Sequence, residues 1–152
     1  MYNKMNLGVV GCGIVGGSLA NLLEDLGHVV KRYDPAKRLT DNIYKCDVIF
    51  LCVPTKPDMQ FKDIKTAVAY TNIENKKGII CIRSTLMPNK RWHHLSFSHR
   101  PFVYLPEFLR ERTALEDEIH PHKIIVGTEI QSRLNIIKKL FEPIIVKKRK
   151  TH

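Results

Sequence analysis

The sequence holds 152 residues with a mass of 17.6 kDa, which suffices for one well-buried domain and leaves little room for a second. Hydrophobic residues make up 43% and charged residues 26%, a balance that excludes disorder of the chain as a whole. The formal net charge of +10 at pH 7 favours anionic partners without identifying them.

The apolar stretches are too short for a membrane protein. Residues 1–6 are polar and lack the apolar core of a signal peptide. The longest apolar runs, 48–53 and 78–82, fall far below the roughly twenty residues that cross a bilayer.

The cysteines stand singly, which is typical of core residues in a reducing compartment rather than of a zinc site. We therefore expect a soluble, cytoplasmic protein without a metal centre. The cysteines are Cys12, Cys46, Cys52 and Cys81.

The pattern of apolar residues predicts strands that alternate with helices. Continuous apolar runs are typical of parallel strands buried on both faces, and apolar residues three or four positions apart predict the helices. We expect an α/β domain with a doubly wound, mostly parallel, Rossmann-like sheet over residues 1–146, followed by a basic tail at 147–152. The predicted strands cover 5–10, 28–33, 46–55, 78–85, 100–106, 122–127 and, at a sheet edge, 143–148; the predicted helices cover 14–26, 61–73, 89–95 and 129–141.

A glycine-rich turn joins the first strand to the first helix in the stretch GVVGCGIVGGSLANLL, which begins at residue 8. In such a sheet the turn and the helix N-terminus face a crevice that suits pyrophosphate. Gly11 permits the tight turn, Gly13 lets the backbone approach the phosphates, and Gly16 allows the helix to pack closely on the strand. Ile14 and Val15 open that helix and belong to the predicted cofactor site. The alternative is that the glycines only form a compact turn.

An acidic residue completes this pattern, because Asp34 follows the second predicted strand, eighteen positions after Gly16. At that place a carboxylate accepts hydrogen bonds from the adenosine ribose and repels a 2′-phosphate, which favours NAD over NADP. Lys37 and Arg38 follow, and a cation there can tolerate the extra phosphate. We include Arg38 in the predicted cofactor site. With strand, helix and acid all in place, NAD binding is favoured over a simple turn.

Three later stretches carry a family resemblance: LCVPTKP from Leu51, IRSTLMP from Ile82 and YLPEFLRERTALEDEIHPHKIIVG from Tyr104. In order and spacing they resemble the N-terminal NAD-binding domain of the UDP-glucose/GDP-mannose dehydrogenase family, most closely its UDP-glucose 6-dehydrogenase branch. The resemblance covers nearly the whole chain. It implies an oxidoreductase-type domain with NAD as cofactor and a UDP-sugar as a possible further partner.

The resemblance also implies roles for individual residues. Thr85 helps to position a water and the reacting groups, and Glu107 takes part in acid/base chemistry, so these two are the candidate catalytic residues. Glu107, Phe108 and Leu109 match residues that hold the sugar nucleotide, and Glu111 matches one on the nicotinamide side. The other matched cofactor positions are Val53, Pro54, Thr55 and Ser84, with Thr85 shared between the two sets.

The chain also departs from the family. The family's reaction oxidises a sugar alcohol to a carboxylate through a thioester on a cysteine in a second domain, and we expect these residues to lack both that cysteine and the sugar-nucleotide domain. Leu105 replaces an asparagine and Arg112 replaces a glycine of the family's motif. Thirteen positions separate Asp34 from Asp47, where the family has another βα unit, so we expect the sheet to lack one edge strand.

Three functions are open on this basis. The first is the NAD-binding part of a nucleotide-sugar dehydrogenase, incomplete alone and completed by a partner chain. The second is a non-catalytic NAD or nucleotide-sugar binding or regulatory module, which the missing nucleophile favours. The third, nucleic-acid binding, rests on the basic charge and is disfavoured because aromatic interleaving and a known binding motif are absent. We also expect a homodimer, since a domain without its family neighbours exposes apolar surface.

Overall fold

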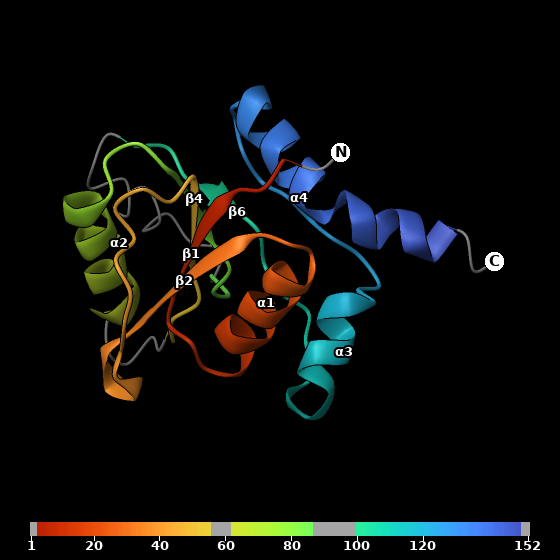
Figure 1. Ribbon diagram of the computed structural model, residues 1–152, viewed down its shortest axis with the longest axis horizontal. Helices are drawn as coiled ribbons and strands as arrows, with labels where there is room; N and C mark the ends of the chain where they lie inside the picture. Colours follow the sequence, from red (N-terminus) through yellow and green to blue (C-terminus); the bar gives the residue numbers. More distant parts are fainter. Residues whose placement is uncertain (1–2, 56–61, 87–99, 150–152) are drawn as a thin grey trace.

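The structure is a computed structural model that describes residues 3–55, 62–86 and 100–149. Within these residues a six-stranded sheet carries helices on both faces (Figure 1). The strands are β1 (Asn6–Val10), β2 (Val29–Asp34), β3 (Leu39–Thr40), β4 (Val48–Leu51), β5 (Ile79–Ile82) and β6 (Val103–Tyr104). The helices are α1 (Ile14–Asp25), α2 (Lys62–Glu74), α3 (Ala114–Ile119) and α4 (Gln131–Arg149), with 3₁₀ turns η1 (Pro35–Lys37) and η4 (Glu111–Thr113). The mostly parallel α/β fold predicted from the sequence is confirmed.

The strand order creates a crevice at one edge of the sheet. The strands run β3-β2-β1-β4-β5-β6, and β1 pairs in parallel with both β2 and β4. The winding therefore changes direction beside β1, and open α/β sheets bind their ligands outside the C-terminal ends of the strands at such a point. The glycine turn follows β1 directly and lies at that position.

Both faces of the sheet are buried, which is why its strands read as continuous apolar runs. Phe50 of β4 lies in the apolar cluster under α1 and α4, whereas its neighbours Ile49 and Leu51 lie in the cluster under α2. All three side chains are fully buried, and burying a side chain of this size contributes about 2 kcal/mol. Figure 1 shows the same division, with α2 on one side of the sheet and α1, α3 and α4 on the other.

A short connection follows β2 at the edge of the sheet. Between Asp34 and Asp47 the chain forms η1, β3 and a loop, and β3 pairs antiparallel with β2. The residues from 34 to 47 are all described and contain no further βα unit, as their spacing predicted. Ile43 of the loop is fully buried in the cluster under α2 and fills part of the face at this edge.

Asn75, just after α2, ties this loop to the sheet. Its amide nitrogen donates to the carbonyl oxygens of Ile43 at 2.7 Å and Cys46 at 2.9 Å. Its Oδ1 accepts from the backbone N–H groups of Lys77 at 3.2 Å and Gly78 at 2.7 Å. Asn75 is 1% exposed. Because buried backbone groups without partners are costly, this one side chain stabilises the connection on both sides.

The segment 143–148, predicted as an edge strand, lies in α4, so that prediction is wrong. The helix continues because Ile137, Leu140 and Ile144 are buried at helical spacing on both sides of Pro143. Burial of this stripe outweighs the roughly 3 kcal/mol that a proline costs inside a helix. Residues 143–148 therefore offer no open sheet edge. Such an edge was one reason for expecting a homodimer.

Residues 122–127 do not form the predicted strand either. They meet β6 at one antiparallel bridge, where Tyr104 and Gly127 exchange two hydrogen bonds of 2.8 Å. Since β6 is only two residues long, residues 122–127 cannot form a longer strand beside it. The short α3 was not predicted, the predicted helix 89–95 lies outside the described residues, and the boundary after residue 146 stays a prediction. None of the helices in the described ranges is long and apolar enough to cross a membrane.

We expect Asn75→Ala to lower the free energy of unfolding by about 3 kcal/mol, because several buried backbone groups lose their partner. Asn42→Ala is the matched control, since Asn42 is exposed and its Oδ1 accepts from the nearby Tyr44 N–H. That control should cost less than about 1 kcal/mol. Urea unfolding followed by circular dichroism measures both, and equal losses in the two variants would contradict the role given to Asn75.

Candidate functional site

The turn after β1 requires glycine at two positions. Gly11 has a φ of +84°, and a Cβ atom there would lie 2.6 Å from the carbonyl oxygen of Cys52. On α1, a Cβ atom at Gly16 would lie 1.9 Å from the carbonyl oxygen of Gly11. Both obstacles are backbone atoms, so α1 reaches this distance from the turn only if neither residue has a side chain. These are the tasks that the sequence assigned to the two glycines.

Gly13 is different, because its surroundings are open. Nothing lies within 4 Å of a Cβ atom built on it. It immediately precedes α1, whose first backbone N–H groups have no partners inside the helix and carry a partial positive charge. The missing side chain therefore leaves the helix N-terminus accessible to an anionic group.

Asp34, at the end of β2, is hydrogen-bonded to the glycine turn. Its Oδ2 accepts from the backbone N–H of Cys12 at 2.8 Å. Lys37 of η1 donates from Nζ to the carbonyl oxygen of the same Cys12, also at 2.8 Å. Arg38 follows in the left-handed region with a φ of 57°. Asp34, eighteen positions after Gly16 in sequence, is thus in direct contact with the glycine turn.

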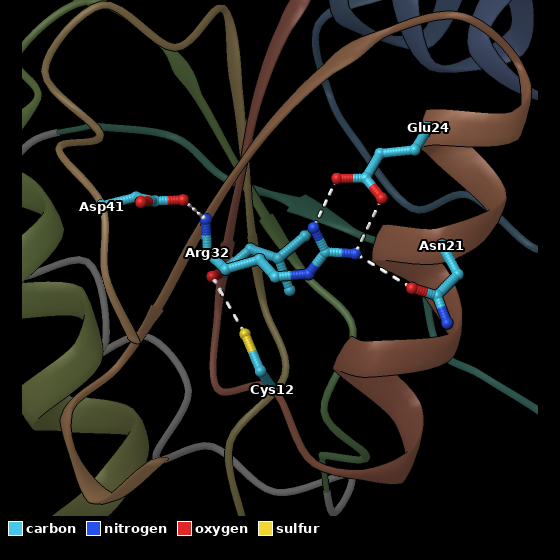
Figure 2. A network of polar contacts seen from close by, with 6 residues as sticks. Cys12, Asn21, Glu24, Arg32 and Asp41 are labelled. Atoms are coloured by element: carbon cyan, nitrogen blue, oxygen red, sulfur yellow. Dashed lines mark hydrogen bonds and ion pairs between the residues drawn. The ribbon is translucent and has the colours of Figure 1, made fainter. Parts of the chain in front are cut away.

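A second polar network holds β2 against α1. Figure 2 shows the guanidinium of Arg32, two residues before Asp34, between Glu24 and Asn21 of α1. Arg32 Nη2 donates to Glu24 Oε2 at 3.0 Å and to Asn21 Oδ1 at 2.9 Å, and Nη1 donates to the other Glu24 oxygen. The hydrogen bond from Arg32 lowers the pKa of Glu24. On the other side, Asp41 accepts from the Arg32 backbone N–H at 2.9 Å. This network fixes the end of β2 that carries Asp34.

Hydrogen bonds join the loops after β4 and β5. The Ser84 hydroxyl donates to the carbonyl oxygen of Val53 at 2.6 Å and accepts from the Val53 N–H at 3.0 Å. The Thr55 hydroxyl donates to the carbonyl oxygen of Thr85 at 2.6 Å. The structure therefore brings together these four predicted residues, which come from two separate motifs.

These elements surround a cleft of about 650 Å³, a volume within the range of small-molecule sites. The glycine turn, the end of β2, the loops after β4 and β5 and the segment after β6 all contribute to it. Gly16 lies beneath the turn, and Arg38 and Phe108 lie outside the lining. The predicted residues that line the cleft are Gly11, Gly13, Ile14, Val15, Asp34, Val53, Pro54, Thr55, Ser84, Thr85, Glu107, Leu109 and Glu111.

Sequence reasoning missed three residues of the lining: Ala36, Cys52 and Arg83. Ala36 belongs to η1, which was not predicted, and Cys52 was interpreted as a core residue. Arg83 stands directly before Ser84 and Thr85, and that position was the available signal.

The segment after β6 carries Glu107 and Glu111 over the cleft. Glu107 Oε2 accepts from the Leu109 N–H at 2.9 Å, so its carboxylate turns back on its own loop. The Arg110 side chain and backbone N–H both donate to Asp117 of α3, at 2.7 to 3.1 Å. The Arg110 side chain is the main reason that the pKa of Asp117 lies well below its usual range. The loop is thus anchored to α3 through Arg110.

Three further predicted or substituted positions lie elsewhere. Phe108 is half exposed, with Lys123 Nζ 4.5 Å from the centroid of its ring. Leu105 is fully buried in the cluster under α1 and α4, where an apolar side chain fits. Arg112 lines an open groove between α1 and α3 and not the cleft.

The cysteine thiols are not activated. Cys12, Cys46 and Cys81 are buried, and Cys52 is partly buried at the wall of the cleft. Burial raises the pKa of the Cys46 thiol to about 11 and that of Cys81 to about 12, and it also raises the pKa of Cys12 and Cys52. A nucleophilic cysteine needs a lowered pKa. Among the described residues, no three His, Cys, Asp or Glu side chains are grouped as metal ligands.

The fold and the site define a Rossmann-type nucleotide-binding domain, with a glycine turn and an acid at the ends of neighbouring parallel strands. The chain belongs to the UDP-glucose/GDP-mannose dehydrogenase family, because the profile of that family's NAD binding domain matches residues 29–145. The match begins at β2, so the glycine turn precedes it and is supported by its own geometry.

Relatives and solved structures agree with this assignment. A UDP-glucose 6-dehydrogenase from Rickettsia felis is 29% identical over 137 residues, which cover 79% of this chain and 30% of the relative. The fold matches a UDP-glucose dehydrogenase from Pyrobaculum islandicum with a TM-score of 0.75 at 22% identity, covering 94% of this chain and 45% of that one. It matches GDP-mannose dehydrogenase from Pseudomonas aeruginosa with a TM-score of 0.73 at 19% identity, covering 91% and 44%. The chain spans less than half the length of each.

We expect Gly16→Ala to lower the free energy of unfolding by about 3 kcal/mol or more, because its Cβ must displace the Gly11 carbonyl. Gly17→Ala is the matched control on the same helix, since its Cβ would be 3.7 Å from the nearest atom, the Cys12 carbonyl oxygen. The control should gain up to about 1 kcal/mol from its better helix propensity. Thermal or urea unfolding compares the two, and a Gly16→Ala protein as stable as wild type would refute the close approach.

Proposed function

We propose that this chain binds NAD in the cleft and forms the dinucleotide-binding part of an oxidoreductase that acts on a nucleotide sugar. The pyrophosphate lies over the Gly11–Gly16 turn and the start of α1, and the adenosine ribose lies on Asp34. One observation carries the proposal: the Asp34 carboxylate accepts a hydrogen bond from the open glycine turn, and both line the cleft. The family's NAD binding domain supports it.

Asp34 supports NAD over NADP. Oδ2 accepts from the Cys12 N–H, while Oδ1 has no hydrogen-bond partner in the described part of the chain and is free for a ribose hydroxyl. A 2′-phosphate at this place meets a negative carboxylate. Lys37 gives little compensation, because its ammonium already donates to the carbonyl oxygen of Cys12.

The cleft also supports the nucleotide-sugar part of the proposal. Thr85 and Glu107 line it together, although they come from segments after different strands. We assign them the catalytic roles that the resemblance implies, with Glu107, Phe108 and Leu109 on the sugar side. The names of the relatives, UDP-glucose 6-dehydrogenase and GDP-mannose dehydrogenase, point to a nucleotide sugar as the substrate class.

Isothermal titration of the purified protein tests the proposed cofactor. Wild type should give a saturable heat with NAD at millimolar concentration or below, and a weaker one with NADP. Gly13→Leu should weaken NAD binding by more than about tenfold, roughly 1.4 kcal/mol, because its side chain fills the space that the phosphates need. The same variant should unfold near the wild-type midpoint, since that space is empty of protein atoms. A folded wild-type protein without any heat at millimolar NAD would refute the proposal.

The cysteine environments favour a second function for these 152 residues, namely NAD binding without turnover. An acid/base glutamate and a positioned water do not replace a covalent nucleophile that holds the aldehyde for a second oxidation. We therefore expect the purified 152-residue chain to produce no NADH from UDP-glucose and NAD, followed at 340 nm. Steady NADH production that Glu107→Gln abolishes would contradict this expectation and require a different mechanism.

A further inference from the structure

A buried ion pair connects the wall of the cleft to α3. Arg83 follows β5, and its Nη2 donates to the two carboxylate oxygens of Glu118 at 2.8 and 2.7 Å. The two side chains are 6% and 3% exposed. Arg83 lines the cleft, whereas Glu118 does not line it but lines a second, smaller pocket together with Arg83 and Glu107. Glu118 therefore stands outside the proposed NAD site but holds a residue of its wall.

Other charged side chains lie close to this pair. Besides Arg83 and Glu118, the smaller pocket is lined by two further carboxylates, Glu107 and Asp117, and by Lys123. Burial raises the pKa of Glu118, the charge of Arg83 opposes this, and the charge of Glu107 adds to it. Arg83 Nε is also a buried donor without a partner among the described atoms. Replacing a buried ion pair by apolar side chains is often neutral or stabilising, so stability alone gives a weak reason for this arrangement.

The pair joins the segment after β5 to α3, the helix that follows the Glu107–Glu111 loop. On one side, the Arg83 N–H donates to the carbonyl oxygen of Leu51 at 2.9 Å, and the next residue, Ser84, is bonded to Val53. On the other side, Glu118 belongs to α3, which directly follows the loop of Glu107 and Glu111. The ion pair thus links the strand-end loops to the loop that lies over them.

We propose that Glu118 is a positioning residue, which through Arg83 sets the distance between the Ser84–Thr85 segment and the Glu107–Glu111 loop. This inference rests on the proposed function, since both segments carry residues assigned to the cofactor site, namely Ser84 and Thr85 on one and Glu111 on the other. Loss of Glu118 frees Arg83, a buried cation, to move toward the cleft or toward Glu107. NAD binding then weakens although Glu118 itself does not contact the ligand.

The test compares NAD affinity with stability in matched variants. Glu118→Leu should raise the Kd for NAD by about fivefold or more, the lower end of typical coupling between sites, and should lower the unfolding midpoint. Glu118→Gln keeps an acceptor for Arg83 and should bind NAD more tightly than Glu118→Leu. The double variant Arg83→Met, Glu118→Leu should regain the midpoint but keep the weak binding. Asn75→Ala, which is destabilised far from the cleft, should keep the wild-type Kd.

The outcomes separate the two proposals. If wild type binds no NAD, the proposed function falls and this inference falls with it. If wild type binds NAD and Glu118→Leu binds it with the same Kd, the proposed function stands and the positioning role is overturned. If Glu118→Leu does not fold, the double variant decides, because wild-type affinity in that protein shows that the ion pair serves stability alone.

Discussion

The site depends on the close approach of α1 to the turn after β1. A Cβ atom on Gly16 would lie 1.9 Å from the Gly11 carbonyl oxygen, so the helix can pack this closely only with glycine at position 16. This contact puts the helix N-terminus at the ends of β1 and β4. It also brings the backbone N–H of Cys12 within 2.8 Å of the Asp34 carboxylate. A shift of α1 would therefore separate the glycine turn from its acid.

Hydrogen bonds within the protein hold several segments of the cleft in place. Cys12 joins the turn to Asp34 and Lys37, and the hydroxyls of Ser84 and Thr55 join the loops after β4 and β5. Such preorganisation lowers the entropy that a ligand must lose from the protein on binding. The remaining segment, from Glu107 to Glu111, is anchored through α3, and for that reason the Arg83–Glu118 pair matters to the same cleft.

The sequence predicted the features that depend on local pattern. The continuous apolar run of β4 and the spacing of buried residues in α1 and α2 come from burial on a fixed periodicity, which is visible in one dimension. The roles of Gly11 and Gly16 followed from the tight turn and the nearby acid. Thr55, Ser84 and Thr85 were assigned through the family resemblance, and the C-terminal ends of parallel strands bring their loops to one edge of the sheet.

Features that depend on distant partners were not predictable in this way. The helix through Pro143 forms because Ile144 is buried against the sheet, and the apolar residues of 122–127 gave no sign that β6 is too short to pair with them. Arg83 was missed because its partner Glu118 is 35 residues away and lies in a helix of six residues that was not predicted. Asn75 likewise acts on a loop some thirty positions earlier in the chain.

In the proposed site the glycine turn and Asp34 together hold the dinucleotide. Amide NMR spectra of ¹⁵N-labelled protein, recorded during titration with NAD, test it at the residues themselves. We expect saturable shifts of the Gly11, Cys12, Gly13 and Ile14 signals, with smaller changes at Thr55 and Ser84 and none along α2. Saturable shifts confined to other surfaces, or an unchanged spectrum of a folded protein at millimolar NAD, would contradict it.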